Sequence, residues 1–392
     1  MMHPDLKNSP DWPDGGFGVY VHWPFCLAKC PYCDFNSHVS REVDQQAWCD
    51  ALIAEARHMR SLTGPRGANT VFFGGGTPSL MPPETVAAII SEIDGLWGLE
   101  PDAEITLEAN PTSVEAAKFR AYAEAGVNRV SMGVQALNDR DLKALGRMHS
   151  AAEARAAFDV AREVFTRVSF DLIYARMGQS VAAWEAELGE ALAMAIDHLS
   201  LYQLTIEAGT RFAELHGRGR LVIPEDDIAA EMYDLTQQMT TDAGLPAYEV
   251  SNHARPGAES RHNLIYWRYG DYAGIGPGAH GRLTGKDGQR RALDTLRDPA
   301  KWLSSVASAG QAIRATEDIE SSAQAEEYLM MGLRLVEGID LSRFRRLAGR
   351  DLPADRLATL IASGHLHRCG DHISASSSGR VVLNTVLSEL LT

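Results

Sequence analysis

The chain has 392 residues, of which 45% are hydrophobic and 23% are charged, and its formal net charge is −15. This length is enough for two or three domains with a large core, and the composition is that of an ordinary folded protein and excludes extensive disorder. The acidic balance argues against a nucleic-acid surface, which needs clustered Lys and Arg.

The first 16 residues are expected to form an N-terminal tail. They lack a basic start followed by an apolar run, so they do not predict a secretory signal. No segment has the length of apolar sequence that a membrane span needs. Five cysteines in a chain of this size suit a reducing compartment better than a disulfide framework, and we expect a cytoplasmic protein.

Residues 17–216 alternate short β-branched or aromatic runs with longer amphipathic stretches, a pattern typical of parallel βα units. Six strands are predicted at residues 18–23, 69–73, 103–108, 128–133, 167–173 and 198–204. The spacing of apolar residues predicts helices at residues 43–59, 83–96, 114–125, 151–165 and 181–196. Right-handed crossovers would curl these units into a partial (β/α)6 barrel, which is an α/β fold.

The rest of the chain departs from this pattern. Residues 217–314 are expected to form an extension that contains a linker, a helix at 225–243 and an aromatic, Gly-rich segment at 248–281. We expect that segment not to continue the barrel. A C-terminal unit at 315–392 is predicted to be mainly helical and winged-helix-like, with helices at 324–336 and 341–347 and strands at 365–368 and 380–383. Its acidic surroundings favour a packing or partner surface over DNA reading.

Three cysteines follow the first predicted strand with the spacing CxxxCxxC: Cys26, Cys30 and Cys33. Soft thiolates select iron–sulfur clusters or zinc, and a structural zinc site would want a fourth ligand. If three thiolates bind a four-iron cluster, one iron keeps an open coordination position. An open position indicates that a substrate or another ligand can bind there. The other two cysteines, Cys49 and Cys369, are expected to be buried small hydrophobic residues.

Further polar and glycine-rich motifs fall where predicted strands end, which is where βα barrels carry their functional groups. The run Gly74–Thr77 offers bare backbone that can approach a ligand closely, but no Gly-Lys-Ser/Thr follows it, so it is not a phosphate-binding loop. Four side chains lie in the strings ITLEANP, VSMGVQALN, LGRMH and SFDLIY: Glu108, Gln135, Arg147 and Asp171. Carboxylates accept bonds from hydroxyl and ammonium groups, and Arg147 can pair with a carboxylate. Each alone could be a solvated or capping group.

The string GVYVHWPFCLAKCPYCDF, residues 18–35, resembles the radical S-adenosylmethionine (SAM) family. Within it the resemblance is to the branch that contains the oxygen-independent coproporphyrinogen III oxidases and the heme chaperones, and it covers nearly the whole chain. It implies a 4Fe–4S cluster on the three cysteines and SAM on the open iron. Matched motif by motif, the SAM contacts implied are Tyr20, Tyr32, Gly75, Gly76, Thr77, Glu108, Gln135, Arg147 and Asp171.

The string HNLIYW at residues 262–267 matches the HNxxYW string of the heme-chaperone branch. A neutral imidazole is a good axial ligand for heme iron, and aromatic side chains can cover a porphyrin face. We therefore expect His262, Tyr266 and Trp267 to bind heme, with His253 and His280 as rival ligands. The alternative is that a His and two aromatics at helical spacing simply pack in a core.

Two functions remain the main candidates, and radical chemistry on another substrate stays open as a third, since a fold does not fix a function. The first is a heme chaperone that binds heme and transfers it to an apo-hemoprotein, with the cluster and SAM regulating or organising the protein. The second is an oxygen-independent coproporphyrinogen III oxidase that uses a 5'-deoxyadenosyl radical. The resembling oxidases carry a fourth cysteine where this chain has Phe35, and a longer N-terminal arm, so the chaperone is favoured and enzymatic activity stays undecided.

Other expectations concern partners and one local loop. The expected partners are heme or porphyrin, an apo-hemoprotein recipient, an electron donor and a transient membrane-protein contact, with no nucleic acid.

After SFDLIY the family usually continues Gly-Leu-Pro, whereas residues 175–177 read Ala-Arg-Met. This departure concerns the loop shape and not the cluster.

Overall fold

The fold is organised around one long sheet. The structure is a computed structural model that describes residues 11–40 and 42–391, so the first ten residues of the predicted N-terminal tail lie outside the described residues. The 11 strands follow the order β13-β12-β11-β10-β1-β4-β5-β6-β7-β8-β9. Neighbouring strands from β1 to β8 run parallel, which confirms the predicted βα fold. These strands are β1 (Phe17–Trp23), β4 (Ala68–Gly75), β5 (Leu99–Ala109), β6 (Arg129–Gln135), β7 (Arg167–Tyr174) and β8 (His198–Gln203).

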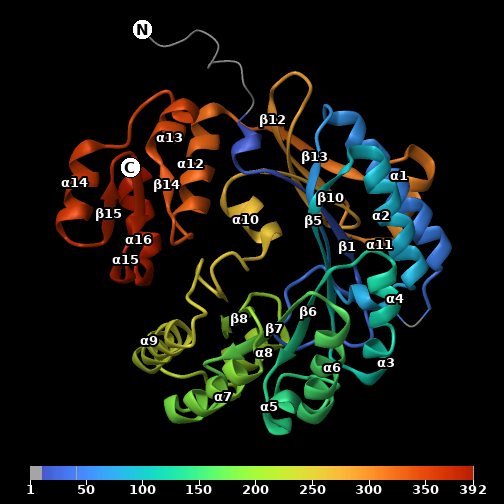
Figure 1. Ribbon diagram of the computed structural model, residues 1–392, viewed down its shortest axis with the longest axis horizontal. Helices are drawn as coiled ribbons and strands as arrows, with labels where there is room; N and C mark the ends of the chain where they lie inside the picture. The colour runs from blue at the N-terminus through green and yellow to red at the C-terminus, as the bar shows by residue number, and fades with distance from the viewer. Residues whose placement is uncertain (1–10, 41, 392) are drawn as a thin grey trace.

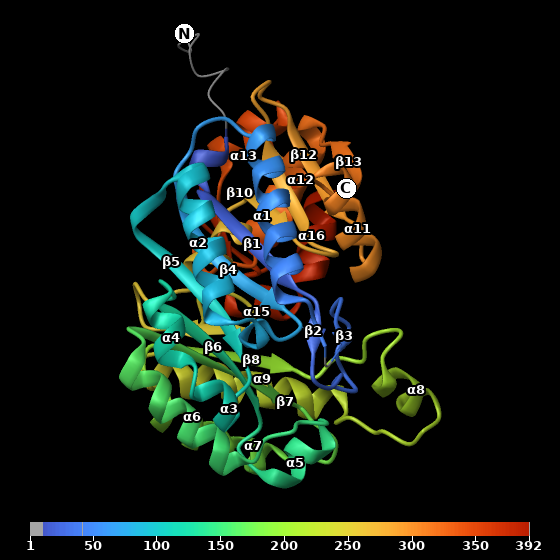
Figure 2. The same ribbon diagram turned by 90° about the vertical axis from the view of Figure 1, so that its right-hand side faces the viewer.

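Helices cover the outer side of the curved sheet (Figures 1 and 2). They are α1 (Gln45–Leu62), α2 (Pro83–Trp97), α3 (Ser113–Ala116), α4 (Phe119–Glu124), α5 (Asp139–Ala144), α6 (Ala151–Val164) and α7 (Val181–Met194). The single helix predicted at 114–125 is interrupted between α3 and α4. There the amide of Lys118 donates to the carbonyl of Glu115, and this tighter i→i+3 bond breaks the α-helical pattern.

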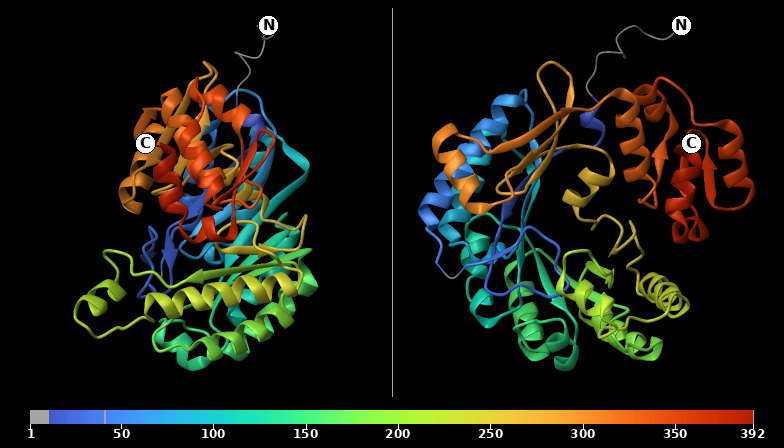
Figure 3. Two further views of the ribbon diagram at one scale, coloured as in Figure 1. Left: turned by 90° about the vertical axis from the view of Figure 1, so that its left-hand side faces the viewer. Right: turned by 180° about the vertical axis from the view of Figure 1, so that it is seen from behind.

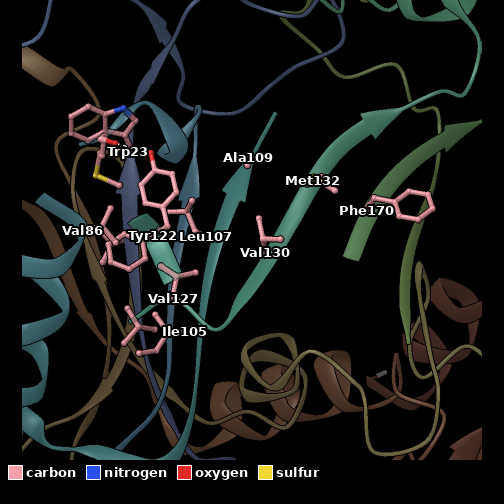
Figure 4. Packing of buried hydrophobic residues seen from close by; sticks show 14 of the residues in the cluster. Trp23, Val86, Ile105, Leu107, Ala109, Tyr122, Val127, Val130, Met132 and Phe170 are labelled. Atoms are coloured by element: carbon pink, nitrogen blue, oxygen red, sulfur yellow. Dashed lines mark hydrogen bonds between the residues drawn. The ribbon is translucent and has the colours of Figure 1, made fainter. Parts of the chain in front are cut away.

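Alternation along each strand separates an apolar outer face from a polar inner face. On β5, Ile105 and Leu107 point to the outer helices and pack in the main core with Tyr122 of α4, as Figure 4 shows. The intervening residues of β5, Thr106 and Glu108, therefore face the inside of the curve. Residues alternate in the same way on the neighbouring strands. Most of the polar side chains described below therefore lie on the inner face of the sheet.

The segment at 248–281 extends the sheet, so the expectation that it would not continue the barrel was wrong. Its strand β10 (Asp271–Ile275) pairs in parallel with β1, and β9 (Asn252–Ala254) pairs antiparallel with β8. Between them, α10 (Arg261–Trp267) contacts β1, β4 and β10 and lies on the inner side of the curve (Figure 1). The pairing of β10 with a strand about 250 residues earlier leaves no local signal in the sequence.

The remaining elements connect these parts. The antiparallel edge is formed by β11 (His280–Thr284), β12 (Arg290–Thr295) and β13 (Ile313–Asp318). Short elements near the strand ends are η2 (Trp12–Asp14), β2 (Phe25–Cys26), β3 (His38–Val39), η3 (Pro78–Leu80) and α8 (Arg211–Gly217), and two longer helices are α9 (Asp226–Asp242) and α11 (Pro299–Ala309). Among the described residues, no helix combines the length and apolar character needed to cross a membrane.

The C-terminal part has its own hydrophobic cluster and lies apart from the outer helices, on the other side of α10 (Figures 1 and 3). It contains α12 (Ser321–Gly332), α13 (Leu341–Ala348), α14 (Ala354–Ala362), α15 (Ser377–Val381) and α16 (Leu383–Leu391). A small sheet joins β14 (Ile339–Asp340), β16 (His372–Ala375) and β15 (Leu366–Cys369). This arrangement agrees with a mainly helical unit that carries a hairpin.

Two local predictions in this part were wrong. The strand predicted at 380–383 is helical, because Leu383, Val386 and Leu390 belong to one buried helical face, and β16 is the true hairpin partner. Cys369 is exposed at the end of β15, not buried, because it sits next to the hairpin turn. Cys49, in contrast, is only 6% exposed, as expected.

Candidate functional site

A cavity opens at the carboxyl ends of the parallel strands. Every residue predicted to bind the cluster or SAM lines this cavity except Tyr20; these residues are Cys26, Cys30, Tyr32, Cys33, Gly75, Gly76, Thr77, Glu108, Gln135, Arg147 and Asp171. They come from six different segments of the chain. The fold therefore brings together the strand-end motifs that the sequence only placed in series.

The loop that carries the cysteines is tied down at Asn36. The Asn36 side-chain amide donates to the carbonyls of Pro277 at 2.8 Å and Arg297 at 2.9 Å. Its backbone carbonyl is 2.9 Å from Nε2 of buried His22. A side chain on Gly278 would come within 2.6 Å of the Asn36 amide, so glycine is needed for this close approach. The cysteine loop is thus anchored to β1 and to a part of the chain about 250 residues away.

The glycine turn after β4 packs directly against the cysteine loop. A Cβ on Gly75 would lie 2.6 Å from the His22 ring, and a Cβ on Gly76 would lie 2.7 Å from the Phe25 carbonyl. Gly75 also has φ of 113°, which disfavours other residues. The amide of Thr77 donates to the Phe25 carbonyl at 2.9 Å. Because these glycines have no side chain, the turn after β4 can pack in direct contact with the cysteine loop.

The three sulfur atoms have polar neighbours. Thr77 Oγ1 donates to Cys26 Sγ at 3.5 Å, Arg147 Nη1 donates to Cys30 Sγ at 3.3 Å, and Ser37 Oγ lies 3.7 Å from Cys33 Sγ. Burial raises the pKa of the Cys26 thiol, and the other two cysteines raise it further, whereas the Thr77 hydroxyl lowers it. A positively charged iron centre would reverse this preference and stabilise the thiolates.

This donor set fits a multi-iron cluster better than one metal ion. The described residues contain no group of three or more His, Cys, Asp or Glu side chains arranged to hold a single ion. In a cubane cluster each thiolate binds a different iron, so the three sulfurs need not converge on one point. The Nε atom of Arg147 is also buried with no hydrogen-bond partner among the described residues, which leaves a donor for a ligand carboxylate.

Two carboxyl groups face the cavity from neighbouring inner positions. Burial, with a smaller effect of Asp171, raises the pKa of Glu108 to about 8, although the Gly75 amide donates to it at 3.1 Å. Burial likewise raises the pKa of Asp171 to about 6, opposed by hydrogen bonds from Ser200 and Ser131. Arg129 opposes the rise of both pKa values but does not cancel it, and two carboxyl groups with raised pKa values are suited to a cationic ligand.

Gln135 and the two predicted tyrosines occupy different layers. Gln135 has φ of 72°, an uncommon conformation for a residue other than glycine and a form of strain that occurs at binding sites. Tyr32 lies beside Cys30 and Arg147, and burial raises the pKa of its hydroxyl. Tyr20 does not line the cavity: its hydroxyl lies 3.0 Å from His22 Nδ1, one layer deeper in the curve of the sheet.

The predicted heme ligand His262 is only 1% exposed. Its Nδ1 lies 2.6 Å from Thr70 Oγ1 and its Nε2 lies 2.7 Å from the Tyr266 hydroxyl. Burial, with a smaller effect of Arg129, lowers the pKa of His262 to about 3, so the imidazole is neutral at physiological pH. In this conformation both ring nitrogens are in use, and neither is available to an iron.

His262 belongs to an aromatic wall on the inner side of the sheet. Its ring stacks on Phe72 at 5.0 Å and meets Tyr266 edge-on at 4.8 Å. Tyr266 in turn meets Tyr272 of β10 edge-on at 4.5 Å, and Tyr20 lies 6.2 Å from Phe72. All of these rings except that of His262 are half-buried, so the wall presents aromatic surface to the inside of the curve.

The other candidate heme residues lie in different surroundings. Trp267 is half-buried, and its Nε1 has no partner among the described residues. His253 is 1% exposed, and burial lowers its pKa to about 4. His280 is exposed at the start of β11, and no described residue makes a hydrogen bond to its ring. Of the rivals, His280 is the accessible imidazole.

Several residues that shape the cavity were not predicted. Asn36 and His22 anchor the cysteine loop, and Asn110 lines the cavity between Thr77 and Arg147. Asn110 follows Glu108 by two residues within ITLEANP, so its place after a strand end was a usable signal. The role of Asn36 depends on the distant Pro277 and Arg297, which no local pattern reveals.

Comparisons with known proteins agree with this geometry. Residues 20–187 match the Radical SAM superfamily model, and residues 319–382 match the HemN C-terminal domain. The mouse protein named "Radical S-adenosyl methionine domain-containing protein 1, mitochondrial" is 40% identical over 98% of this chain and 89% of its own length. The heme chaperone HemW of Escherichia coli (strain K12) is 37% identical, over 95% of this chain and 97% of its own.

Among solved structures, the chain is similar to HemN, the coproporphyrinogen III oxidase from Escherichia coli. The TM-score is 0.80 with 22% sequence identity, and the match covers 97% of this chain and 91% of that one. At this identity the likeness concerns the fold, including the partial barrel and the C-terminal unit.

Proposed function

Since this chain belongs to the HemW heme-chaperone branch of the radical SAM superfamily, we propose that it binds heme and passes it to an apo-hemoprotein. The observation that carries the proposal is the half-buried aromatic wall around α10. Flat aromatic surfaces suit a porphyrin face, and this wall adjoins the cavity that holds the cysteines.

We propose that Cys26, Cys30 and Cys33 hold a 4Fe–4S cluster and that SAM occupies the same cavity. The SAM contacts are the remaining cavity residues predicted above, with Tyr20 acting from the layer beneath. When bound, the cluster and SAM supply one-electron chemistry. The chain's own contribution is to orient these groups through the glycine turn, and to offer Arg147 to a carboxylate and Glu108 and Asp171 to hydroxyl or ammonium groups.

For heme we propose contact through His262, Tyr266 and Trp267, with His262 Nε2 as the axial ligand. This requires the Tyr266 hydroxyl to leave Nε2, while Thr70 keeps Nδ1 and so orients the ring, as partners of metal-bound histidines commonly do. In the heme-free protein the Tyr266 hydroxyl therefore occupies Nε2 of His262. The exposed His280 is the competing ligand.

The test compares hemin binding by variants that keep a full cluster. Tyr266→Phe retains the ring and removes the hydroxyl that competes for Nε2, so hemin affinity should rise about fivefold, the equivalent of one hydrogen bond near 1 kcal/mol. His262→Ala should weaken binding, and Trp267→Phe serves as the matched aromatic control. Difference absorbance in the Soret region gives the affinity. If His262→Ala and Tyr266→Phe both bind like the parent while His280→Ala does not, the ligand is His280.

A second measurement decides between transfer and catalysis. Heme-loaded protein is mixed with apomyoglobin, and the appearance of holo-myoglobin is followed; transfer supports the chaperone. In parallel, cluster-loaded protein receives reductant, SAM and coproporphyrinogen III under anaerobic conditions. Sustained formation of protoporphyrinogen would overturn the chaperone proposal and make the chain an oxidase.

The physiological setting is part of the same proposal. An apo-hemoprotein is the recipient and an electron donor serves the cluster, with transient contact to a membrane protein where the recipient is one. A protein whose five cysteines are all free suits a reducing compartment, for which we propose the cytoplasm. The mouse relative carries a mitochondrial name, so the compartment differs among relatives.

A further inference from the structure

We propose that Asn110 is a positioning residue that aims two hydrogen-bond donors at the sulfurs of Cys26 and Cys30 and thereby sets the reduction potential of the bound cluster. The inference rests on the proposed cluster site. Asn110 stands between the two donors: its Oδ1 accepts from Arg147 Nη2 at 2.5 Å, and its Nδ2 donates to Thr77 Oγ1 at 3.2 Å.

The orientation of the Asn110 amide follows from its partners. Arg147 offers only donors, so the Asn110 atom facing it must be the oxygen. The nitrogen is then directed at Thr77 Oγ1 and uses a lone pair of that hydroxyl. The hydroxyl hydrogen of Thr77 is left for another acceptor, and Cys26 Sγ lies 3.5 Å away. Asn110 thus determines the direction in which Thr77 donates.

Arg147 is held in the same manner. Its Nη2 donates to Asn110 and, at 2.8 Å, to the carbonyl of Gly133, so the guanidinium plane is defined by two acceptors. Its Nη1 consequently points to Cys30 Sγ at 3.3 Å. Because the guanidinium is planar and rigid, moving Nη2 away from Asn110 would also displace Nη1 from the sulfur.

Asn110 is itself immobilised at the end of β5. Its backbone amide donates to Glu115 Oε2 at 2.8 Å, and Glu115 is 3% exposed and also accepts from the Ser79 hydroxyl. One amide side chain, with a buried anchor behind it, therefore controls two sulfur contacts from two other segments.

The expected consequence is electrostatic. Donors to the cysteine sulfurs stabilise the more negative, reduced form of an iron–sulfur cluster, so they raise its potential. A positive guanidinium does this more strongly than a neutral hydroxyl. If Asn110 no longer aligns these donors, the reduced form loses stabilisation and the potential falls.

The test is a potentiometric titration of cluster-loaded full-length protein without SAM, followed by electron paramagnetic resonance. Asn110→Leu keeps the side-chain size and removes both bonds. We expect about a tenfold shift toward the oxidised cluster, which is about 59 mV lower for a one-electron couple. Thr77→Val, which removes the Cys26 contact and the bond from Asn110 Nδ2 but leaves the bond between Asn110 and Arg147, should give a smaller shift. Asn138→Ala, which removes an asparagine that caps α5, should leave the potential unchanged.

The double variant separates a positioning role from a general loss of structure. If Asn110 acts through Thr77 and Arg147, its effect must shrink in a Thr77→Val background, because part of the interaction is already absent. Fully additive shifts, or an unchanged potential in Asn110→Leu with a full cluster, overturn the proposal. Should Asn110→Leu lose the cluster, Asn110→Gln is titrated instead, since it keeps the amide and misplaces it. Failure of the parent protein to take up a cluster would refute the proposed site itself.

Discussion

We predict that the carboxyl group of Glu108 makes SAM binding depend on pH. Burial raises its pKa to about 8 in the ligand-free protein, so at neutral pH the group is mostly protonated. A ligand with a sulfonium and an ammonium group favours the carboxylate, as do ribose hydroxyls that donate to it. In the proposed site, we therefore expect SAM binding to be accompanied by loss of a proton from Glu108.

The size of the effect follows from this pKa. A carboxyl group of pKa near 8 is about one-tenth ionised at pH 7 and about one-hundredth at pH 6. The affinity for SAM should then rise about tenfold per pH unit between about pH 6 and 8 and level off above about pH 8.5. Asp171, whose pKa is raised to about 6, should steepen the dependence only below that pH. Glu108→Gln should bind more weakly at pH 8.5 and show little dependence between pH 6.5 and 8.5.

Isothermal titration calorimetry of SAM into the cluster-loaded protein measures both quantities. Repeating the titration in two buffers of different ionisation enthalpy gives the number of protons released at pH 7, which should approach one for the parent and zero for Glu108→Gln. An affinity of the parent that stays constant from pH 6 to 8, with no proton release, would refute the assignment of a protonated Glu108 in the free site.

Three further predictions concern the cluster loop and the core. Cys30→Ala should abolish the visible charge-transfer absorption of the cluster, whereas Cys49→Ala should retain it; a full cluster in the first variant would contradict the ligand assignment. Asn36→Ala removes two side-chain bonds to backbone carbonyls and should speed cluster loss to a chelator several-fold with little change in the circular dichroism spectrum, while an unchanged loss rate would show that the anchor is dispensable. Burial raises the pKa of Glu55 to about 7 against three N–H donors. Its contribution to the free energy of unfolding is therefore complete below about pH 4.5 and lost as pH rises through 7, so the melting temperature of the parent should fall more over this range than that of Glu55→Gln.

Sequence periodicity predicted the six parallel strands because their signal is local. Largely buried strands such as β6 and β7, each followed by a helix with its own apolar period, carry a local pattern. The strand β10 has Gly and Ala among its five residues and acquires its place only by pairing with β1. The run at 380–383 was too short to distinguish a strand from the start of α16.

The site shows the same division between local and distant information. All but one of the residues predicted from the cysteine spacing and the strand-end motifs line the cavity, because parallel strands deliver their ends to one edge. The environment of His262 was not predictable in this way: Thr70, which takes its Nδ1, lies 192 residues away. Nor could spacing alone show that Asn110 sits between two donors to sulfur.

The anchor at Asn36 also has a consequence for the order of events during synthesis. Its bond to the Arg297 carbonyl spans 261 residues, which a ribosome takes roughly 10 to 50 s to add. Throughout that interval Cys26, Cys30 and Cys33 are already outside or leaving the exit tunnel without the clamp that shapes their loop. Iron delivery to a finished loop must therefore wait until residue 297 has been added, and a nascent chain that ends with the radical SAM segment at residue 187 has the thiolates but not their clamp.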